Sequence, residues 1–160
     1  MPFYEALEEE VVKAQAKGKS IIMELDANCK LGTEYIPNDP KPMSGKGKIM
    51  AGIVDRHVLC VANGISDKVK GTITRKRSTK DHIEESVIDL VIVSADMVKY
   101  IESVHIDEEK LKVLTSFTHT QKGVIKKESD HNSKETRFNI EWEKKVKPQR
   151  LEIFNFKDKE

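Results

Sequence analysis

One segment constrains the fold of this chain more than any other. Residues 86–94, with the sequence Ser-Val-Ile-Asp-Leu-Val-Ile-Val-Ser, place apolar side chains on both faces of any strand they form. Strands that are apolar on both faces lie inside sheets that are covered on both sides. The segment is too short to cross a bilayer, which takes about 20 apolar residues in a helix, and Asp89 interrupts it. We therefore expect a layered protein with residues 86–94 at its centre and without a membrane-spanning segment.

Asp89 needs a partner, because an isolated carboxylate inside an apolar strand is costly. A backbone group or an arginine would make Asp89 structural, whereas a histidine would give it a role in chemistry. The motif Ser129-Asp130-His131 offers a histidine shortly before the last expected strand. A carboxylate beside a histidine fixes its tautomer and favours its charged form, which can bind a phosphate oxygen or support proton transfer. The residues alone leave both roles of Asp89 open.

The other elements follow from helical and alternating patterns along the chain. An opening helix is predicted at 2–18 by four apolar residues at helical spacing, Phe3, Leu7, Val11 and Ala14. We further expect strands at 20–25, 57–62, 71–75, 86–94, 104–106 and 137–142, helices at 48–54 and 96–101 (the second capped by Asp96), a loop at 32–47, and a hairpin of 111–119 with 124–127. Helices and strands alternate early and strands dominate late, which favours a layered α/β fold with a mixed sheet.

Composition limits the class of protein further. The chain has 160 residues, which suits one domain, and 38% of them are hydrophobic, which allows a real core. The charged fraction of 34% is above that of an average globular protein, yet the profile is not that of a disordered chain. Cys29 and Cys60 are too few for a disulfide framework, and the start of the chain is acidic, unlike a secretion signal. We expect an intracellular protein, nuclear or cytoplasmic.

Charge gives only a local argument about partners. The formal net charge of +1 does not indicate nucleic-acid binding by itself. Two stretches are nevertheless basic: Lys68, Lys70, Arg75, Lys76, Arg77 and Lys80 in the first, and Lys144, Lys145, Lys147 and Arg150 in the second. Such stretches are more often solvated surface than contact sites, and both interpretations remain open.

Asp26 and Asn28 are polar residues at the point where the strand 20–25 ends. Residues two apart in an extended chain point to the same side, so the carboxylate and the amide would face one spot. The carboxylate can accept a proton from water, and the amide can hold a phosphate oxygen. By itself such a pair more often forms a turn. The remaining histidines have no comparable neighbours and are expected to be structural or solvated: His57, His82, His105 and His119.

Three motifs in chain order resemble the C-terminal half of the endonuclease/exonuclease/phosphatase superfamily. The stretch 25–32, Leu-Asp-Ala-Asn-Cys-Lys-Leu-Gly, is similar to its Gly-Asp-Phe-Asn signature. Residues 86–94 are similar to its Ser-x-Ile-Asp-Tyr strand, and residues 129–131 to its closing Ser-Asp-His. The resemblance covers roughly residues 19–142, and more narrowly it is to the endonuclease domains of animal retroelements.

The resemblance implies a fold and an activity. The fold is half of a four-layer α/β sandwich, with a mixed β-sheet and flanking helices, over residues 1–143, followed by a basic tail or linker at 144–160. The activity is cleavage of phosphodiester bonds in nucleic acid, here DNA, with Mg²⁺ or Mn²⁺ as the cofactor.

The resemblance also implies roles for individual residues. Asp26 would activate the attacking water, Asn28 and His131 would bind the scissile phosphate, Asp89 would orient His131, and Asp130 would lie near the metal. Thr74 and Arg75, which stand where the family often has a threonine followed by an aromatic residue, are candidate substrate-binding residues.

The chain also departs from the family pattern. Leu25 and Ala27 replace the Gly and Phe of the signature, and only one helix precedes Asp26, where the family's N-terminal half supplies the principal metal-binding Glu. We therefore expect weak or absent hydrolysis by this chain alone, and a broad exposed apolar sheet face. Either a partner chain or self-association covers that face, or the sequence is a truncated form of the domain. Two alternatives remain: a non-catalytic module that binds nucleic acid or protein, and the same fold acting on a phosphorylated lipid or nucleotide.

Overall fold

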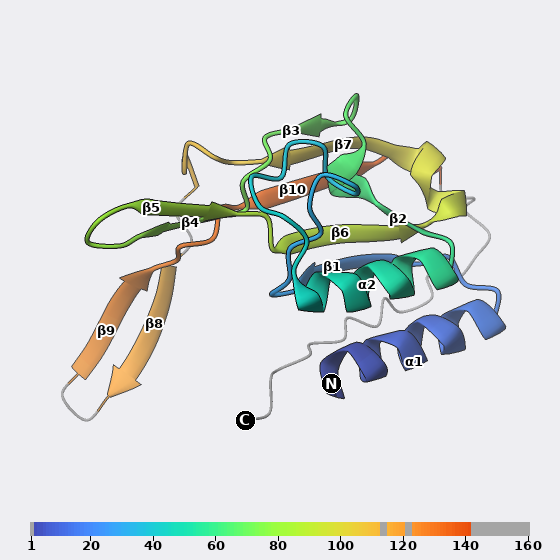
Figure 1. The fold of residues 1–160 in the computed structure, drawn as a ribbon, viewed down its shortest axis with the longest axis horizontal. Helices are drawn as coiled ribbons and strands as arrows, with labels where there is room; N and C mark the ends of the chain where they lie inside the picture. Colours follow the sequence, from blue (N-terminus) through green and yellow to red (C-terminus); the bar gives the residue numbers. More distant parts are fainter. Residues whose placement is uncertain (1, 113–114, 121–122, 142–160) are drawn as a thin grey trace.

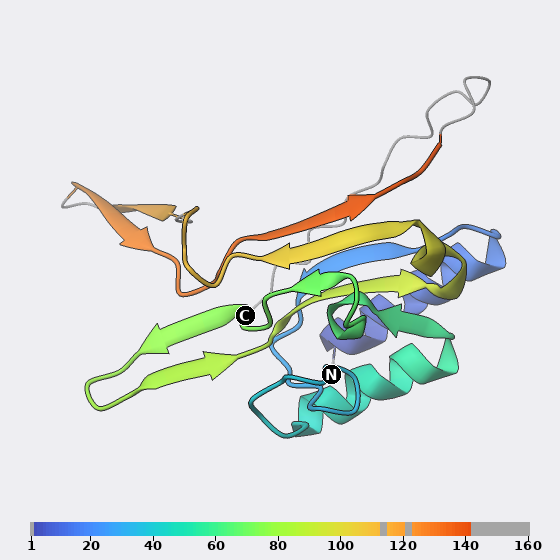
Figure 2. The same cartoon turned by 90° about the horizontal axis from the view of Figure 1, so that it is seen from above.

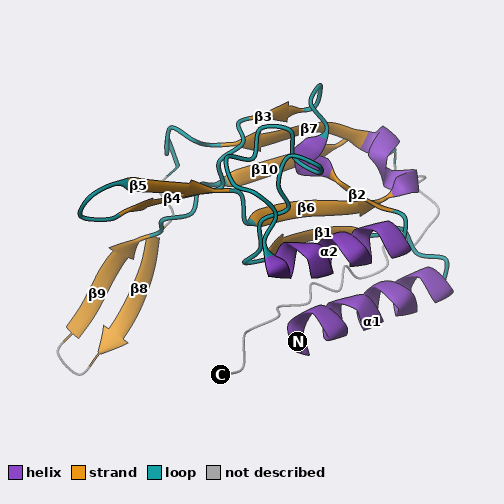
Figure 3. Ribbon diagram, viewed as in Figure 1, coloured by secondary structure: helices purple, strands orange, loops and turns teal. Residues whose placement is uncertain are grey.

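The computed structural model describes residues 2–112, 115–120 and 123–141 (Figures 1 and 3). The end of the last expected strand and the expected basic tail at 144–160 lie outside these ranges. The helices are α1 (Pro2–Ala16) and α2 (Gly45–Arg56), with two short 3-10 helices, η1 (Ala62–Gly64) and η2 (Ala95–Tyr100). The strands are β1 (Ile22–Asp26), β2 (Leu59–Val61), β3 (Val69–Lys70), β4 (Arg75–Ser78), β5 (Ile83–Ser86), β6 (Asp89–Ser94), β7 (Ile101–Ile106), β8 (Thr115–Thr120), β9 (Gly123–Glu128) and β10 (Lys134–Phe138).

The elements form three layers, which Figure 1 shows from bottom to top as the helices α1 and α2, a first sheet and a second sheet. The first, sheet A, has the strand order β1-β6-β2 and is antiparallel throughout. The second, sheet B, has the order β10-β7-β3 and is mixed, because β3 runs parallel to β7 and β10 runs antiparallel to it. The predicted α/β fold with a mixed sheet and flanking helices is confirmed.

Strand β6 is the centre of the molecule, as its two apolar faces predict. Leu90 and Ile92 belong to the cluster beneath the helices, whereas Val91 and Val93 belong to the cluster between the two sheets. All four side chains have no exposed surface. The segment 86–94 is not one strand, however: Ser86 ends β5, and β6 begins only at Asp89.

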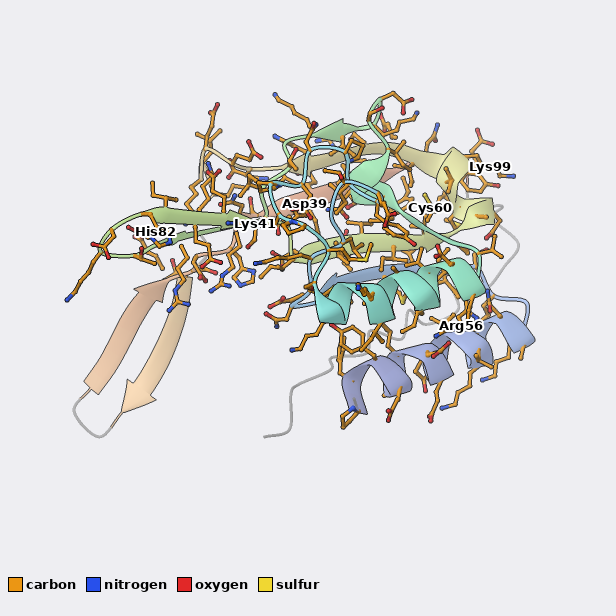
Figure 4. All side chains as sticks on the ribbon, viewed as in Figure 1. Asp39, Lys41, Arg56, Cys60, His82 and Lys99 are labelled. Carbon is orange, nitrogen blue, oxygen red and sulfur yellow. The ribbon has the colours of Figure 1, made fainter. Side chains whose placement is uncertain are left out.

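Helix α1 closes one side of sheet A with the stripe that its spacing predicts. Tyr4, Leu7 and Val11 are its buried residues. The hydroxyl of Tyr4 donates a 2.8 Å hydrogen bond to the carbonyl oxygen of Ala27, in the turn that follows β1. In the middle of the helix, Glu8 accepts from Arg56 at 2.8 Å, and Figure 4 shows Arg56 between the two helices. The helix therefore supports the end of β1 as well as the core.

Helix α2 starts three residues earlier than expected because Ser44 caps it. The Ser44 hydroxyl accepts from the backbone N–H of Gly47 at 3.0 Å. The Ser44 N–H in turn donates to the Lys30 carbonyl at 2.9 Å, which ties the helix start to the chain just after β1. A side chain at position 47 would meet the Lys30 oxygen at 1.9 Å, so only glycine allows this approach.

The strand expected at 71–75 is wrong for residues 71–74. The backbone N–H groups of Thr72 and Ile73 both donate to Glu108 Oε1 at 2.6 Å instead of joining a sheet. The alternation that suggested a strand does not appear in the burial pattern, because the consecutive residues Ile73 and Thr74 are both buried, and a side chain takes the place of a neighbouring strand. Asp96 is also not the cap of η2: that position belongs to Ser94, and Asp96 accepts from the Ser20 hydroxyl.

Two hairpins project from the body of the protein. One is β4–β5 and the other is β8–β9, which confirms the hairpin predicted from residues 111–119 and 124–127, although its first strand begins only at Thr115 (Figures 1 and 2). In both views they leave the molecule at the end where β1 finishes and β6 begins. Strand β5 was not predicted, because its sequence Ile-Glu-Glu-Ser offers little apolar pattern.

The expected broad apolar sheet face is not found in the described part of the chain. The outward positions of sheet B carry the exposed residues Glu102, His105, Glu135 and Arg137. The exposed large hydrophobic side chains there are scattered over several elements: Val12, Ile22, Ile49, Val58, Ile83 and Leu111. Polar residues on alternate positions of β7 and β10 account for the difference. None of the described helices is long and apolar enough to cross a membrane.

Candidate active site

Two aspartates meet at the end of sheet A. Asp26, the last residue of β1, lies directly opposite Asp89, the first residue of β6. Directly opposed residues of antiparallel strands share a face, and this face is the one toward sheet B, because Leu25 and Leu90 point to the helices. The Asp89 side chain is 16% exposed and that of Asp26 43%. The Asp89 carboxylate is therefore largely buried, whereas the Asp26 carboxylate is open to solvent.

Asp89 binds His131, as its burial in an apolar strand suggested. His131 Nδ1 lies 2.9 Å from Asp89 Oδ2 and 3.1 Å from Oδ1. Burial raises the pKa of the Asp89 carboxyl, and the neighbouring His131 partly offsets that rise. With Nδ1 held in this way, the imidazole presents Nε2 to the open side of the pair.

The His131 Nε2 atom faces two further carboxylates. Asp26 Oδ2 lies 3.9 Å away, and Asp130 Oδ1 lies 3.8 Å away. These separations are too long for direct hydrogen bonds, and a single oxygen of water or phosphate can bridge such gaps. The structure thus brings Asp26, Asp89, Asp130 and His131 to one place, although they come from three separate parts of the sequence.

Asp26, Asp89 and His131 also form a group that could hold a metal ion, since one ligand atom from each lies within 4.8 Å of the others. Two carboxylates and an imidazole suit a divalent cation in number and kind. Both oxygens of Asp89 are occupied by His131, so the open oxygens for a hard ion belong to Asp26 and, across Nε2, to Asp130. The donor set therefore fits a divalent ion that keeps several waters.

Asn28 lies next to Asp26, but not in the extended geometry that the spacing suggested. Its φ of 46° is left-handed, a conformation that asparagine tolerates better than most residues. Its backbone N–H donates to Asp26 Oδ1 at 3.1 Å. This turn holds one oxygen of Asp26 and leaves Oδ2 facing His131, so the pair is connected through the backbone.

Asp130 and Arg75, predicted for metal and substrate respectively, bind each other in this structure. Arg75 Nε donates to Asp130 Oδ2 at 2.7 Å, and the Lys76 N–H donates to the Asp130 carbonyl at 2.8 Å. Although burial opposes it, the Arg75 guanidinium holds the pKa of the Asp130 carboxyl below its usual range. The start of β4 is thereby fastened to the segment that carries His131.

Thr74, which was predicted to bind substrate, has no exposed surface in this structure. Its hydroxyl oxygen accepts from the backbone N–H groups of Ile88 at 2.9 Å and Asp89 at 3.0 Å. These donors lie where β5 gives way to β6, a bend that leaves both without a strand partner on that side. Thr74 therefore positions Asp89.

Replacing Thr74 by valine is expected to lower the free energy of unfolding by about 2 kcal/mol, because two buried N–H groups lose their acceptor without a change of shape. Urea unfolding followed by circular dichroism measures the difference. Thr74→Ser keeps the oxygen and serves as the matched variant, with a smaller loss expected. A valine variant as stable as the serine variant would show that the hydroxyl does not hold the bend.

Two residues of this region escaped the sequence-based predictions. Asn63 is buried and donates through Nδ2 to the Asp89 carbonyl at 3.2 Å, while its Oδ1 accepts from the Val91 N–H at 2.7 Å. Lys134 donates through Nζ to the Leu90 carbonyl at 3.2 Å. The Asn-Gly pair at 63–64 indicates only a turn, and a lysine in a strand ordinarily suggests an exposed position.

The other histidines lie outside this site as far as they are described. His57 contacts Glu8 and Gln15 between the helices, at 3.0 Å each. Figure 4 shows His82 on the projecting β4–β5 hairpin, and His105 is exposed on sheet B. The side chain of His119 is outside the described part of the structure.

Comparison with known proteins adds a structural likeness. No protein-family model matches the chain, and no curated protein is similar to it in sequence. Among solved structures, it is similar to the endonuclease domain of TRAS1, a telomere-specific non-LTR retrotransposon, with a TM-score of 0.60 and 19% sequence identity. The likeness covers 86% of this chain and 52% of the other, so the chain spans about half of that domain. The retroelement endonuclease fold expected from the motifs is confirmed.

Proposed function

We propose that this chain is a nuclease-like phosphodiesterase domain that acts on nucleic acid with Mg²⁺ or Mn²⁺, and that it is weakly active by itself. The observation that carries the proposal is the cluster at the end of sheet A, in which Asp89 holds His131 and Nε2 faces Asp26 and Asp130. The likeness in fold to a retrotransposon endonuclease domain supports the same class of substrate.

Each side chain has a distinct task in this proposal. Asp26 Oδ2 accepts the proton of the attacking water, because it is exposed while Oδ1 is held by the turn at Asn28. His131, as an imidazolium, donates through Nδ1 to Asp89 and through Nε2 to a non-bridging phosphate oxygen. Asp89 keeps the ring in place and balances its charge. The water oxygen then forms a new bond to phosphorus while the bond from phosphorus to the leaving alkoxide breaks, and the alkoxide takes a proton from solvent water, which gives a phosphomonoester and an alcohol.

The divalent ion would be held by Asp130 and attracted by the nearby charge of Asp26, with water filling its other positions. Its contribution when bound is to neutralise the charge that develops on the phosphate oxygens. Arg75 is the residue proposed to contact the phosphate backbone, and doing so would release Asp130 from their ion pair. In this structure Arg75 holds one oxygen of Asp130, which supports low activity.

Plasmid nicking tests the proposal. Supercoiled DNA incubated with excess protein and Mg²⁺ is expected to be nicked slowly by the native chain, and not at all after EDTA is added. Asp26→Asn is expected to bring nicking to background, while Asp67→Asn, at an exposed aspartate outside the site, leaves it unchanged. Nicking that persists in Asp26→Asn would contradict the role of Asp26 as the base. Fast nicking by the native chain would contradict the proposal that the chain is weakly active by itself.

The Arg75–Asp130 ion pair favours one second candidate, a non-catalytic module that binds nucleic acid. Arg75 neutralises the Asp130 carboxylate, which the enzymatic proposal assigns to the metal ion. This candidate predicts salt-sensitive DNA binding that persists in Asp26→Ala, together with complete absence of nicking.

A further inference from the structure

Lys134 occupies a position where a charge is unusual. It opens β10, whose partly buried residues Lys134, Thr136 and Phe138 alternate with the exposed Glu135 and Arg137. The inward row faces the space between the two sheets, since Phe138 packs against the apolar cluster there. A lysine on such a row buries its charge only where partners compensate.

The partner of the Lys134 ammonium places it beside the aspartate pair. Its Nζ donates to the carbonyl oxygen of Leu90, the residue that follows Asp89 in β6. Leu90 in turn lies opposite Leu25, next to Asp26. Lys134 belongs to sheet B, but its ammonium group therefore lies at the end of sheet A at which Asp26 and Asp89 meet.

The negative charges of three carboxylates act on this position. Burial lowers the pKa of the Lys134 ammonium, while the negative charges of Glu24, Asp89 and Asp26 act to raise it. Glu24 and Asp26 lie on one face of β1, two residues apart, which is the face toward sheet B. Asp130, the other carboxylate of the site, already has Arg75 as its counter-ion.

We propose that Lys134 is a fixed cation of this site, one that competes electrostatically with a divalent metal ion for the field of Asp26 and Asp89. The proposal rests on the proposed function in one respect, that the site takes a divalent cation. A single positive charge tethered between the sheets repels a second cation entering beside Asp26, and the repulsion is stronger than between surface charges because Lys134 is partly buried. Lys134 thus lowers the metal affinity of the native chain.

Manganese binding tests this inference without any measurement of cleavage. The full chain is titrated with Mn²⁺ at low ionic strength, and the electron paramagnetic resonance signal of free Mn²⁺ gives the dissociation constant. Lys134→Gln removes the charge but keeps N–H donors for the Leu90 carbonyl, and is expected to bind Mn²⁺ at least about tenfold more tightly than the native chain. The gain is expected to shrink as salt is added.

Matched variants separate this effect from simpler ones. Lys112→Gln removes the same charge from an exposed lysine whose Nζ lies 3.5 Å from Glu135, and is expected to leave Mn²⁺ affinity within about twofold, because screened surface charges interact weakly. The double variant Lys134→Gln/Asp26→Asn is expected to lose the gain in Mn²⁺ affinity, which would show that the gain arises at this site. If Lys134→Gln does not fold, as judged by circular dichroism, Lys134→Met takes its place, because an unbranched apolar chain suits the inward row.

Three results would overturn the proposal: unchanged affinity in a folded Lys134 variant, an equal gain in Lys112→Gln, or a gain that survives loss of the Asp26 carboxylate. The first is what a purely structural hydrogen bond to Leu90 would give. Failure of the nicking experiment is a separate outcome, because it concerns cleavage, whereas Mn²⁺ affinity reports the charge balance of the site alone.

Discussion

Substituting glutamine for His131 is expected to lower the rate of phosphodiester cleavage by a factor of about 10² to 10⁴, the usual effect of losing one proton donor or acceptor. Glutamine can still donate one hydrogen bond, but it cannot carry the proton that the imidazolium presents through Nε2. An activated aryl phosphodiester at high protein concentration allows the rate to be measured even if DNA is cut slowly. His105→Gln, at an exposed position of sheet B, is the control and is expected to leave the rate unchanged.

Asp89→Asn distinguishes positioning from direct participation. Because Asp89 acts only by holding Nδ1 of His131, the double variant Asp89→Asn/His131→Gln is expected to be no slower than His131→Gln alone. Additive losses would show that Asp89 contacts the substrate or the metal itself. A His131→Gln variant as fast as the native chain would remove the central residue from the proposed mechanism.

Replacing Ile92 by alanine is expected to lower the free energy of unfolding by about 3 to 4 kcal/mol, since the side chain has no exposed surface and leaves a cavity beneath the helices. That is a large part of the stability of an ordinary domain, which is about 5 to 15 kcal/mol. Urea unfolding measures the loss. Ile83→Ala makes the same substitution on the β4–β5 hairpin, where the side chain is 67% exposed, and is expected to change stability by about 0.5 kcal/mol or less.

Equal losses at the two isoleucines would contradict the placement of β6 at the centre of the protein. A small loss at both would mean that the helices do not pack on sheet A as described.

Elements with a strong apolar pattern could be predicted from the sequence. Helix α1 and strand β6 follow from spacing and from two-sided hydrophobicity, because their own side chains make the core. The charged strands β4 and β5 could not be recognised, since they pair with each other on a projecting hairpin and bury little. Residues 71–74 were misassigned because Glu108, distant in sequence, binds two of their backbone N–H groups.

In the candidate site, too, some residues could be predicted from the sequence and others could not. Asp89 could be singled out because a carboxylate in an apolar strand requires a partner, and the structure supplies His131. The pairing of Arg75 with Asp130 and the reach of Lys134 to Leu90 depend on how sheet B is set against sheet A. No local pattern encodes that arrangement, and for the same reason the burial of Thr74 and its contacts to Ile88 and Asp89 could not be predicted.

The pairing of β1 with β6 has a consequence for how the protein folds. Asp26 and Asp89 are 63 residues apart in the sequence (89 − 26 = 63), whereas the β4–β5 and β8–β9 hairpins join near neighbours. Hairpins close quickly, and long-range pairs wait for a large loop to be closed. A slip of β1 by one residue would also turn Asp26 toward the helices. We therefore expect the aspartate pair to form late in folding, and its presence to indicate that sheet A has closed in its correct register.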